Sequence, residues 1–151
     1  MIMRKGITGF FRRNPLSEFP LPKFQQIAFA CAVRCGFTVA GLSERGVTPN
    51  FHSALLVRWD EKLLMLGHSI YRIIAFAEPH EDFSCELTFR DATDLRECLV
   101  EMYPEFTIAS TTELSLGIQA SDLQMLDRAE VEQVKYWKPR TVGELAFNWW
   151  D

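Results

Sequence analysis

The chain has 151 residues, carries a formal net charge of −4, and is 48% hydrophobic with 24% charged residues. A chain of this length is expected to form one domain and to bury a core without cross-links, and this composition excludes wholesale disorder. No apolar run approaches the roughly 18 residues that a membrane-spanning helix needs, so none is predicted.

Residues 1–14 are predicted to form a loose basic arm, and residues 15–151 a single α+β domain. The arm has no acidic residue and four basic ones, Arg4, Lys5, Arg12 and Arg13. Its apolar run is too short for a signal-peptide core, which predicts a cytoplasmic protein. The four cysteines lie in apolar patterns without a CxxC pair, which favours buried thiols over a metal site.

The first predicted element is a helix that begins near Pro22. Phe24, Ile27, Ala28, Cys31 and Cys35 follow it on one helical face, and Gly36 is well placed to end it. Residues 37–42 are then predicted to form a strand, and residues 43–50 a loop.

Residues 51–77 are the most apolar part of the chain and are predicted to be the centre of the fold. Apolar runs at 54–59, 63–66 and 70–77 are separated by polar or glycine-containing turns, which indicates consecutive antiparallel strands. A further strand is predicted at 83–89, where apolar and polar side chains alternate strictly.

The rest of the chain favours helices. Asp91 is predicted to cap one that Pro104 ends, Ser121 to cap another, and Thr141 with Glu144 to form a capping box for the last. Residues 106–109 favour a short strand. The fold class is therefore α+β: an antiparallel meander of about five strands with an N-terminal helix, two to four helices after the sheet, and the helices packed on one face.

The histidines and serines show no catalytic pattern. His52, His68 and His80 are not spaced as metal ligands, and His68 lies in a predicted turn where a solvated side chain is expected. Ser69 fails the G-x-S-x-G pattern because Tyr71 stands where glycine is needed. We predict no catalytic residue, no metal and no cofactor.

The strongest functional signal is acidic. Between Glu78 and Glu113 ten acidic residues face only two basic ones, a local charge of −8. Such a segment is either a solvated face or a docking surface for a basic protein. The docking interpretation requires a single exposed field that the chain's own arginines and lysines do not neutralise. Its predicted partner-binding acids are Glu78, Glu81, Asp82, Glu86, Asp94, Glu97 and Glu101.

The C-terminal stretch is rich in aromatic residues, with Tyr136, Trp137, Phe147, Trp149 and Trp150 close together. The inward stripe of the last predicted helix needs only Trp149 and Phe147. Trp150 is therefore either a core residue or an interface anchor, and we add it to the predicted partner-binding residues.

The segments YWKPRTVGELAFNWWD (136–151) and GHSIYRIIAF (67–76) resemble small bacterial immunity proteins of polymorphic toxin systems. The resemblance implies a stoichiometric inhibitor that occludes the site of a cognate toxin, and it assigns no contact residue. Together with the acidic segment, it leads us to expect an immunity-type protein that binds a basic toxin, without nucleic acid or membrane.

Two alternatives stay open. The first is a small-molecule-binding or hydrolase-like domain with a pocket near His52, His68 and Tyr71. The second is a scaffold subunit that assembles through Trp149 and Trp150.

Overall fold

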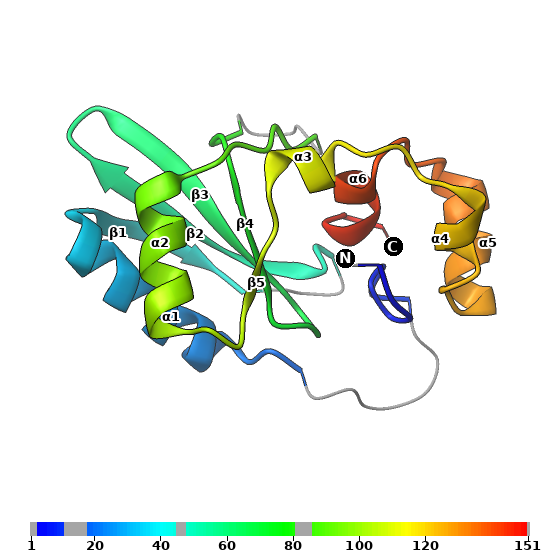
Figure 1. Cartoon of the computed structure of the whole chain (residues 1–151), viewed down its shortest axis with the longest axis horizontal. Coiled ribbons are helices and arrows are strands. Elements are labelled where there is room, and N and C mark those ends of the chain that lie inside the picture. The colour runs from blue at the N-terminus through cyan, green and yellow to red at the C-terminus, as the bar shows by residue number, and fades with distance from the viewer. Residues whose placement is uncertain (1–2, 11–17, 45–47, 81–85, 151) are drawn as a thin grey trace.

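The computed structural model describes residues 3–10, 18–44, 48–80 and 86–150 and has an α+β fold (Figure 1). No helix among these residues is long and apolar enough to cross a membrane. In chain order the elements are α1 (Leu21–Cys35), β1 (Thr38–Ser43), β2 (Phe51–Arg58), β3 (Glu61–His68), β4 (Ile73–Ala77), α2 (Thr93–Met102), β5 (Thr107–Ile108), α3 (Thr111–Leu114), α4 (Ala120–Leu123), α5 (Arg128–Trp137) and α6 (Val142–Ala146).

The sheet has the strand order β1-β2-β3-β4-β5 and is mixed. Strands β1 to β4 form the predicted antiparallel meander. The expectation of a wholly antiparallel sheet is wrong, because β5 pairs with β4 in parallel. The chain crosses over through α2 between these two strands, and such a crossover lets the second strand run in the same direction as the first.

The fifth strand is not the alternating segment 83–89 but β5, which confirms the short strand predicted at 106–109. In the described part of the 83–89 segment, only Phe89 pairs, through an isolated bridge to Ala77. Residues 83–85 lie outside the described residues. The strand predicted at 70–77 begins at Ile73 instead, because the chain turns after Ser69.

The first helix is confirmed, with Pro22 in its first turn and Gly36 in the left-handed region at φ 77°. Two predicted caps are wrong. Asp91 does not cap α2, whose N-cap is Ala92, and the helix expected after Ser121 is two helices that begin after Gln119 and Asp127. Thr141 does cap α6, but its capping box is incomplete because Glu144 Oε2 accepts from Arg140 N (2.7 Å).

Helices cover both faces of the sheet rather than one. Because neighbouring residues of a strand point to opposite faces, Leu63 packs in the core beneath α1 and α2, while Leu64 packs in a second core with α3 and α6. Periodicity showed which side of each helix is buried, but it did not show which face of the sheet that side covers. Strands β1 to β4 lie between α1 and α2 in the sequence, yet both helices pack on the same face.

The N-terminal segment 3–10 is packed, which corrects the expectation of a loose arm for these residues. Ile7 and Thr8 are fully buried, and Ile7 belongs to the second core. Figure 1 shows both ends of the chain beside α6. Residues 3–10 therefore pack against the C-terminal region of the chain.

Candidate functional site

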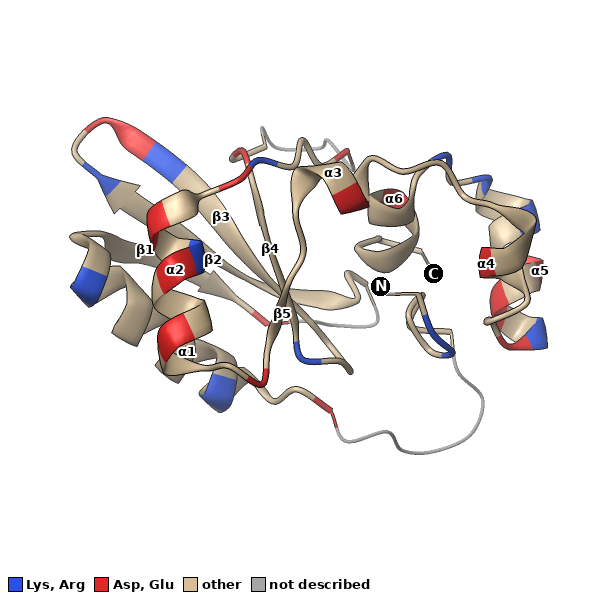
Figure 2. Cartoon of the chain, viewed as in Figure 1, with Lys and Arg blue, Asp and Glu red and all other residues tan. Residues whose placement is uncertain are grey.

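The predicted acids on α2 are exposed, and Figure 2 shows them along the length of that helix. Two of them are neutralised within the chain. Arg58 Nη1 donates to Asp94 Oδ2 (2.7 Å), and Arg34 Nη2 donates to Glu101 Oε2 (2.8 Å). Glu97 forms no ion pair within the described part of the chain. The exposed face of α2 therefore lacks the group of unpaired negative charges that docking of a basic protein was expected to need.

The remaining predicted acids lie elsewhere. Glu78 is 3.5 Å from Arg90 Nη1, which makes it the third predicted acid with an arginine partner. Glu81 and Asp82 lie outside the described residues. Glu86 is exposed and lies with Trp150 on a groove near the C-terminus. The structure thus separates the predicted set instead of gathering it.

His68 is buried, which corrects the expectation of a solvated turn residue. Its Nε2 lies 2.7 Å from the carbonyl oxygen of Ile7, and its Nδ1 accepts from the backbone N–H groups of Ile70 and Tyr71 (both 3.1 Å). Because Nδ1 accepts, Nε2 must donate, which defines a neutral imidazole with its proton on Nε2. His68 therefore joins the N-terminal segment to the β3–β4 turn.

The expected pocket near His52, His68 and Tyr71 is only partly present, because the cavity beside Tyr71 is not lined by either histidine. His52 is also buried, with Nε2 2.6 Å from the carbonyl oxygen of Phe19. A cavity of about 500 Å³ lies beside Tyr71, and neither imidazole lines it. Burial raises the pKa of the Tyr71 hydroxyl, which donates to the carbonyl oxygen of Lys5. The imidazoles thus serve as structural hydrogen-bonding groups.

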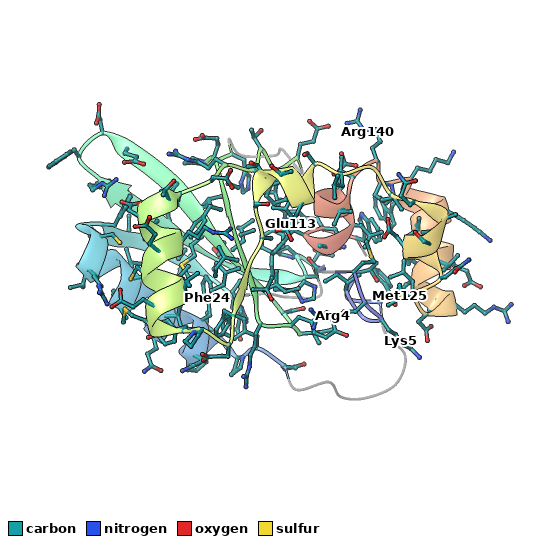
Figure 3. The ribbon with its side chains drawn as sticks, viewed as in Figure 1. Arg4, Lys5, Phe24, Glu113, Met125 and Arg140 are labelled. Carbon is teal, nitrogen blue, oxygen red and sulfur yellow. The ribbon has the colours of Figure 1, made fainter. Side chains whose placement is uncertain are left out.

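Five aromatic side chains line a second cavity of about 580 Å³, here called the C-terminal groove. It lies between the end of α5, the tail after α6 and the segment before Arg90. Its lining residues are Glu86, Leu87, Phe89, Trp137, Pro139, Arg140, Glu144, Phe147, Asn148, Trp149 and Trp150. Arg140 extends outward from the α5–α6 connection (Figure 3).

The tryptophans of the groove have different exposures. Trp150 is only 9% exposed and stacks with Trp137, their planes 3° apart and their ring centroids 6.3 Å apart. Trp137 is 39% exposed, and Tyr136, which packs edge-on against it, is 75% exposed. Trp150 is thus a buried wall of the groove and Trp137 a more accessible one, while Tyr136 is an exposed ring beside Trp137 outside the lining.

Two buried asparagines hold the tail after α6 in place. Asn50 Oδ1 accepts from Asn148 N (2.9 Å), and Asn50 Nδ2 donates to the carbonyl oxygen of Ala146 (3.0 Å). Asn148 Nδ2 donates in turn to the carbonyl oxygens of Thr8 and Leu145. A surface fixed in this way loses little conformational entropy when it binds a partner, so the groove is preorganised.

Carboxylates contribute to the groove beside its aromatic walls. Glu144 is held by the backbone N–H of Arg140 and lies 3.6 Å from that residue's Nε, while Glu86 is exposed. Because Arg140 of the same groove neutralises Glu144, the aromatic ring faces are what suits this surface to an apolar or cationic side chain.

Sequence reasoning placed Trp150 in the site but not Trp137 or Phe89, nor Tyr136 beside Trp137. A signal for Trp137 and Tyr136 was present. Adjacent residues of a helix point about 100° apart, so Tyr136 and Trp137 cannot both face the core. Phe89 was assigned to a strand, and only the tertiary structure brings it to the groove.

No family model, no curated protein and no solved structure matches the chain. In the described ranges, no group of three or more His, Cys, Asp or Glu residues is arranged to hold a metal ion. The described residues thus form an α+β fold with a groove lined by aromatic side chains near the C-terminus.

Proposed function

We propose that this protein is a stoichiometric binding protein that uses the C-terminal groove to hold a protein partner. Its action is of the immunity type: it occupies the functional site of a cognate toxin and so blocks it. The observation that supports the groove is Trp137, which stands 39% exposed at a preformed cavity with Tyr136 beside it. Tryptophan and tyrosine are the residue types most enriched among those that dominate binding energy at protein interfaces.

The partner we propose is basic. The chain's net charge of −4 attracts a positively charged protein over a distance and raises the rate of encounter. The ring faces of the groove then favour a lysine or arginine side chain between the aromatic walls, although Glu144 is already paired with Arg140. In this proposal Glu97 of α2, whose neighbours Asp94 and Glu101 are paired with arginines, contributes to steering, and the aromatic residues supply most of the contact energy.

The test uses the protein encoded beside this chain as the candidate partner. The two are co-expressed and purified, and their affinity is measured by calorimetry with the wild type, with Trp137→Ala and with Trp59→Ala. Trp59 is 92% exposed at the β2–β3 turn, outside the groove, and is the matched control. We expect Trp137→Ala to weaken binding about 30-fold, the ratio for a hot-spot loss of about 2 kcal/mol, and Trp59→Ala to leave it unchanged.

A charge variant separates steering from contact. Glu97→Arg on α2 is expected to slow association and reduce its salt dependence, with little change in the dissociation rate. Glu86→Arg is expected to accelerate dissociation. A complex that ignores Trp137→Ala but is lost on reversal of Glu97 would refute the groove and support the α2 face instead.

A further inference from the structure

The cavity of about 500 Å³ beside Tyr71, here called the Tyr71 cavity, has no part in the function proposed above. Its size falls within the roughly 300–1,000 Å³ that is usual for small-ligand pockets. Four parts of the chain line it: Arg4, residues 18–20 with Lys23, residues 70–73 and residues 105–107. Among the described residues, none lines both this cavity and the C-terminal groove, so what it binds does not depend on the role of that groove.

Three basic side chains from different segments line the Tyr71 cavity: Arg4, Lys23 and Arg72. Within the described ranges, none of the three forms an ion pair. Other basic residues of the chain are paired with carboxylates, namely Lys5, Arg34, Arg58, Arg90, Arg128 and Arg140. In a chain with a surplus of acids, three basic groups left without a carboxylate around one cavity remain available to an anion from outside.

Two of the three basic groups are held against aromatic rings. The guanidinium carbon of Arg4, labelled in Figure 3, lies 4.8 Å from the centroid of the Tyr71 ring. Lys23 Nζ lies 5.3 Å from the centroid of the Tyr103 ring. A cation–π contact of this kind positions a cation without neutralising its charge. Both groups can therefore still donate hydrogen bonds to an anion.

The rest of the lining is mixed. Phe19 and Phe106 are buried, with ring centroids 5.1 Å apart, and Ile70 is half-buried, so these three residues provide an apolar surface. Glu18 and Glu105 are acidic and exposed. Three basic side chains against two acidic ones leave the described lining with a charge of +1. This balance favours a ligand that has one anionic group and an apolar part.

We propose that the Tyr71 cavity binds a small organic anion. Arg4 and Arg72 hold its carboxylate or phosphate group, and its apolar part lies against Ile70 and the phenylalanine rings. The N–H groups of a guanidinium form a planar fork that matches the oxygens of either anion. A nucleic acid fits less well, because its many phosphates would meet the exposed acids of the lining and a chain of net charge −4.

The test measures the binding of four probes to the full chain by calorimetry and NMR titration. Phenyl phosphate and benzoate share a ring and differ in the anionic group, benzyl alcohol is neutral, and inorganic phosphate has no ring. We expect phenyl phosphate, benzoate or both to bind with a Kd below about 1 mM, which identifies the preferred anionic group. Benzyl alcohol and inorganic phosphate should each bind at least about tenfold more weakly.

Two variants change the charge of the lining in opposite directions. Arg72 and Glu105 are both exposed, and neither forms an ion pair in the part of the chain that the structure describes, so both variants are expected to fold. Arg72→Gln should weaken binding at least about tenfold, the effect of losing a hydrogen bond between charged groups. Glu105→Gln should strengthen it at least about twofold, because a repulsive charge is removed.

Lys62→Gln is the matched control. Lys62 is exposed on β3 and does not line the cavity, and its substitution removes one positive charge, as Arg72→Gln does. Circular dichroism checks that each variant is folded. The proposal is overturned if neither phenyl phosphate nor benzoate binds, if benzyl alcohol or inorganic phosphate binds as tightly as they do, or if Lys62→Gln weakens binding as much as Arg72→Gln.

Discussion

At the scale of single residues, Gly67 shows how closely α1 approaches the sheet. The sequence pattern assigned it to a turn, but it lies within β3 and is buried. A Cβ atom added there would lie 2.5 Å from Cδ2 of Phe24, labelled in Figure 3, and 2.9 Å from Cε1 of Phe19. Glycine is thus required at this position by the packing of two phenylalanine rings against the strand.

We expect Gly67→Ala to lower the free energy of unfolding by about 1–3 kcal/mol, the usual effect of overpacking a core. Gly117→Ala is the control, since a Cβ there comes no closer than 4.0 Å to Nε2 of Gln119. Urea denaturation followed by tryptophan fluorescence measures both. Equal stability of the two variants would show that the phenylalanine rings move aside freely.

At the scale of elements, Asp91 joins the start of α2 to the start of α3. Its carboxylate accepts from Thr111 Oγ1 (2.7 Å) and from Thr111 N (3.0 Å). These bonds lower the pKa of Asp91 below its ordinary value, the hydroxyl bond contributing most. A carboxylate predicted to cap its own helix instead stabilises the neighbouring one.

Because folding changes the pKa of Asp91, the free energy of unfolding depends on pH. Because the pKa of Asp91 is lowered in the folded state, its stabilising effect is fully present above the ordinary value of 3.8 and is lost as the pH falls through the folded value. Thr111→Val should raise the folded pKa towards 3.8, as measured by NMR titration of the carboxyl carbon. The free energy of unfolding of Thr111→Val should be lower than that of the wild type near neutral pH, and this difference should shrink in the same acidic range. Thr112→Val, at the exposed neighbouring position, should change neither.

At the scale of the whole molecule, Glu130 joins helix α5 to the N-terminal segment. It is fully buried in α5, where Oε1 accepts from the N–H and hydroxyl of Thr8, and Oε2 from the N–H groups of Gly6 and Asp127. Lys5, labelled in Figure 3, adds an ion pair, with its Nζ 3.4 Å from Asp127 Oδ2. These contacts attach α5 to the N-terminal segment, and α5 carries Trp137, the more exposed of the two stacked tryptophans of the groove.

We expect Glu130→Gln to lower the free energy of unfolding by at least about 2 kcal/mol. The glutamine NH₂ group would replace a carboxylate oxygen that now accepts hydrogen bonds, and it would face N–H donors without being able to accept from them. Glu132→Gln is the matched control. Its side chain is 56% exposed and pairs with Arg128 at the surface, so its effect should stay below about 0.5 kcal/mol. Urea denaturation compares them, and a Glu130→Gln protein as stable as the control would contradict this role.

The sequence by itself determined the elements whose signals are local. The face formed by Phe24 to Cys35 gave α1 with its ending at Gly36, the apolar runs gave β2 and β3, and Thr141 marked the start of α6. Such signals depend on residues within a few positions of each other, and periodicity reports which face of an element is buried.

Only the tertiary structure decided what each buried face meets. The parallel pairing of β5, the partners of Glu130 and Asp91, and the arginines that neutralise Asp94 and Glu101 all join residues distant in the sequence. The groove likewise unites Phe89 with Trp137 and Trp150. Periodicity carries no information about the partner, since many arrangements of the same amphipathic elements bury the same faces, and packing selects among them.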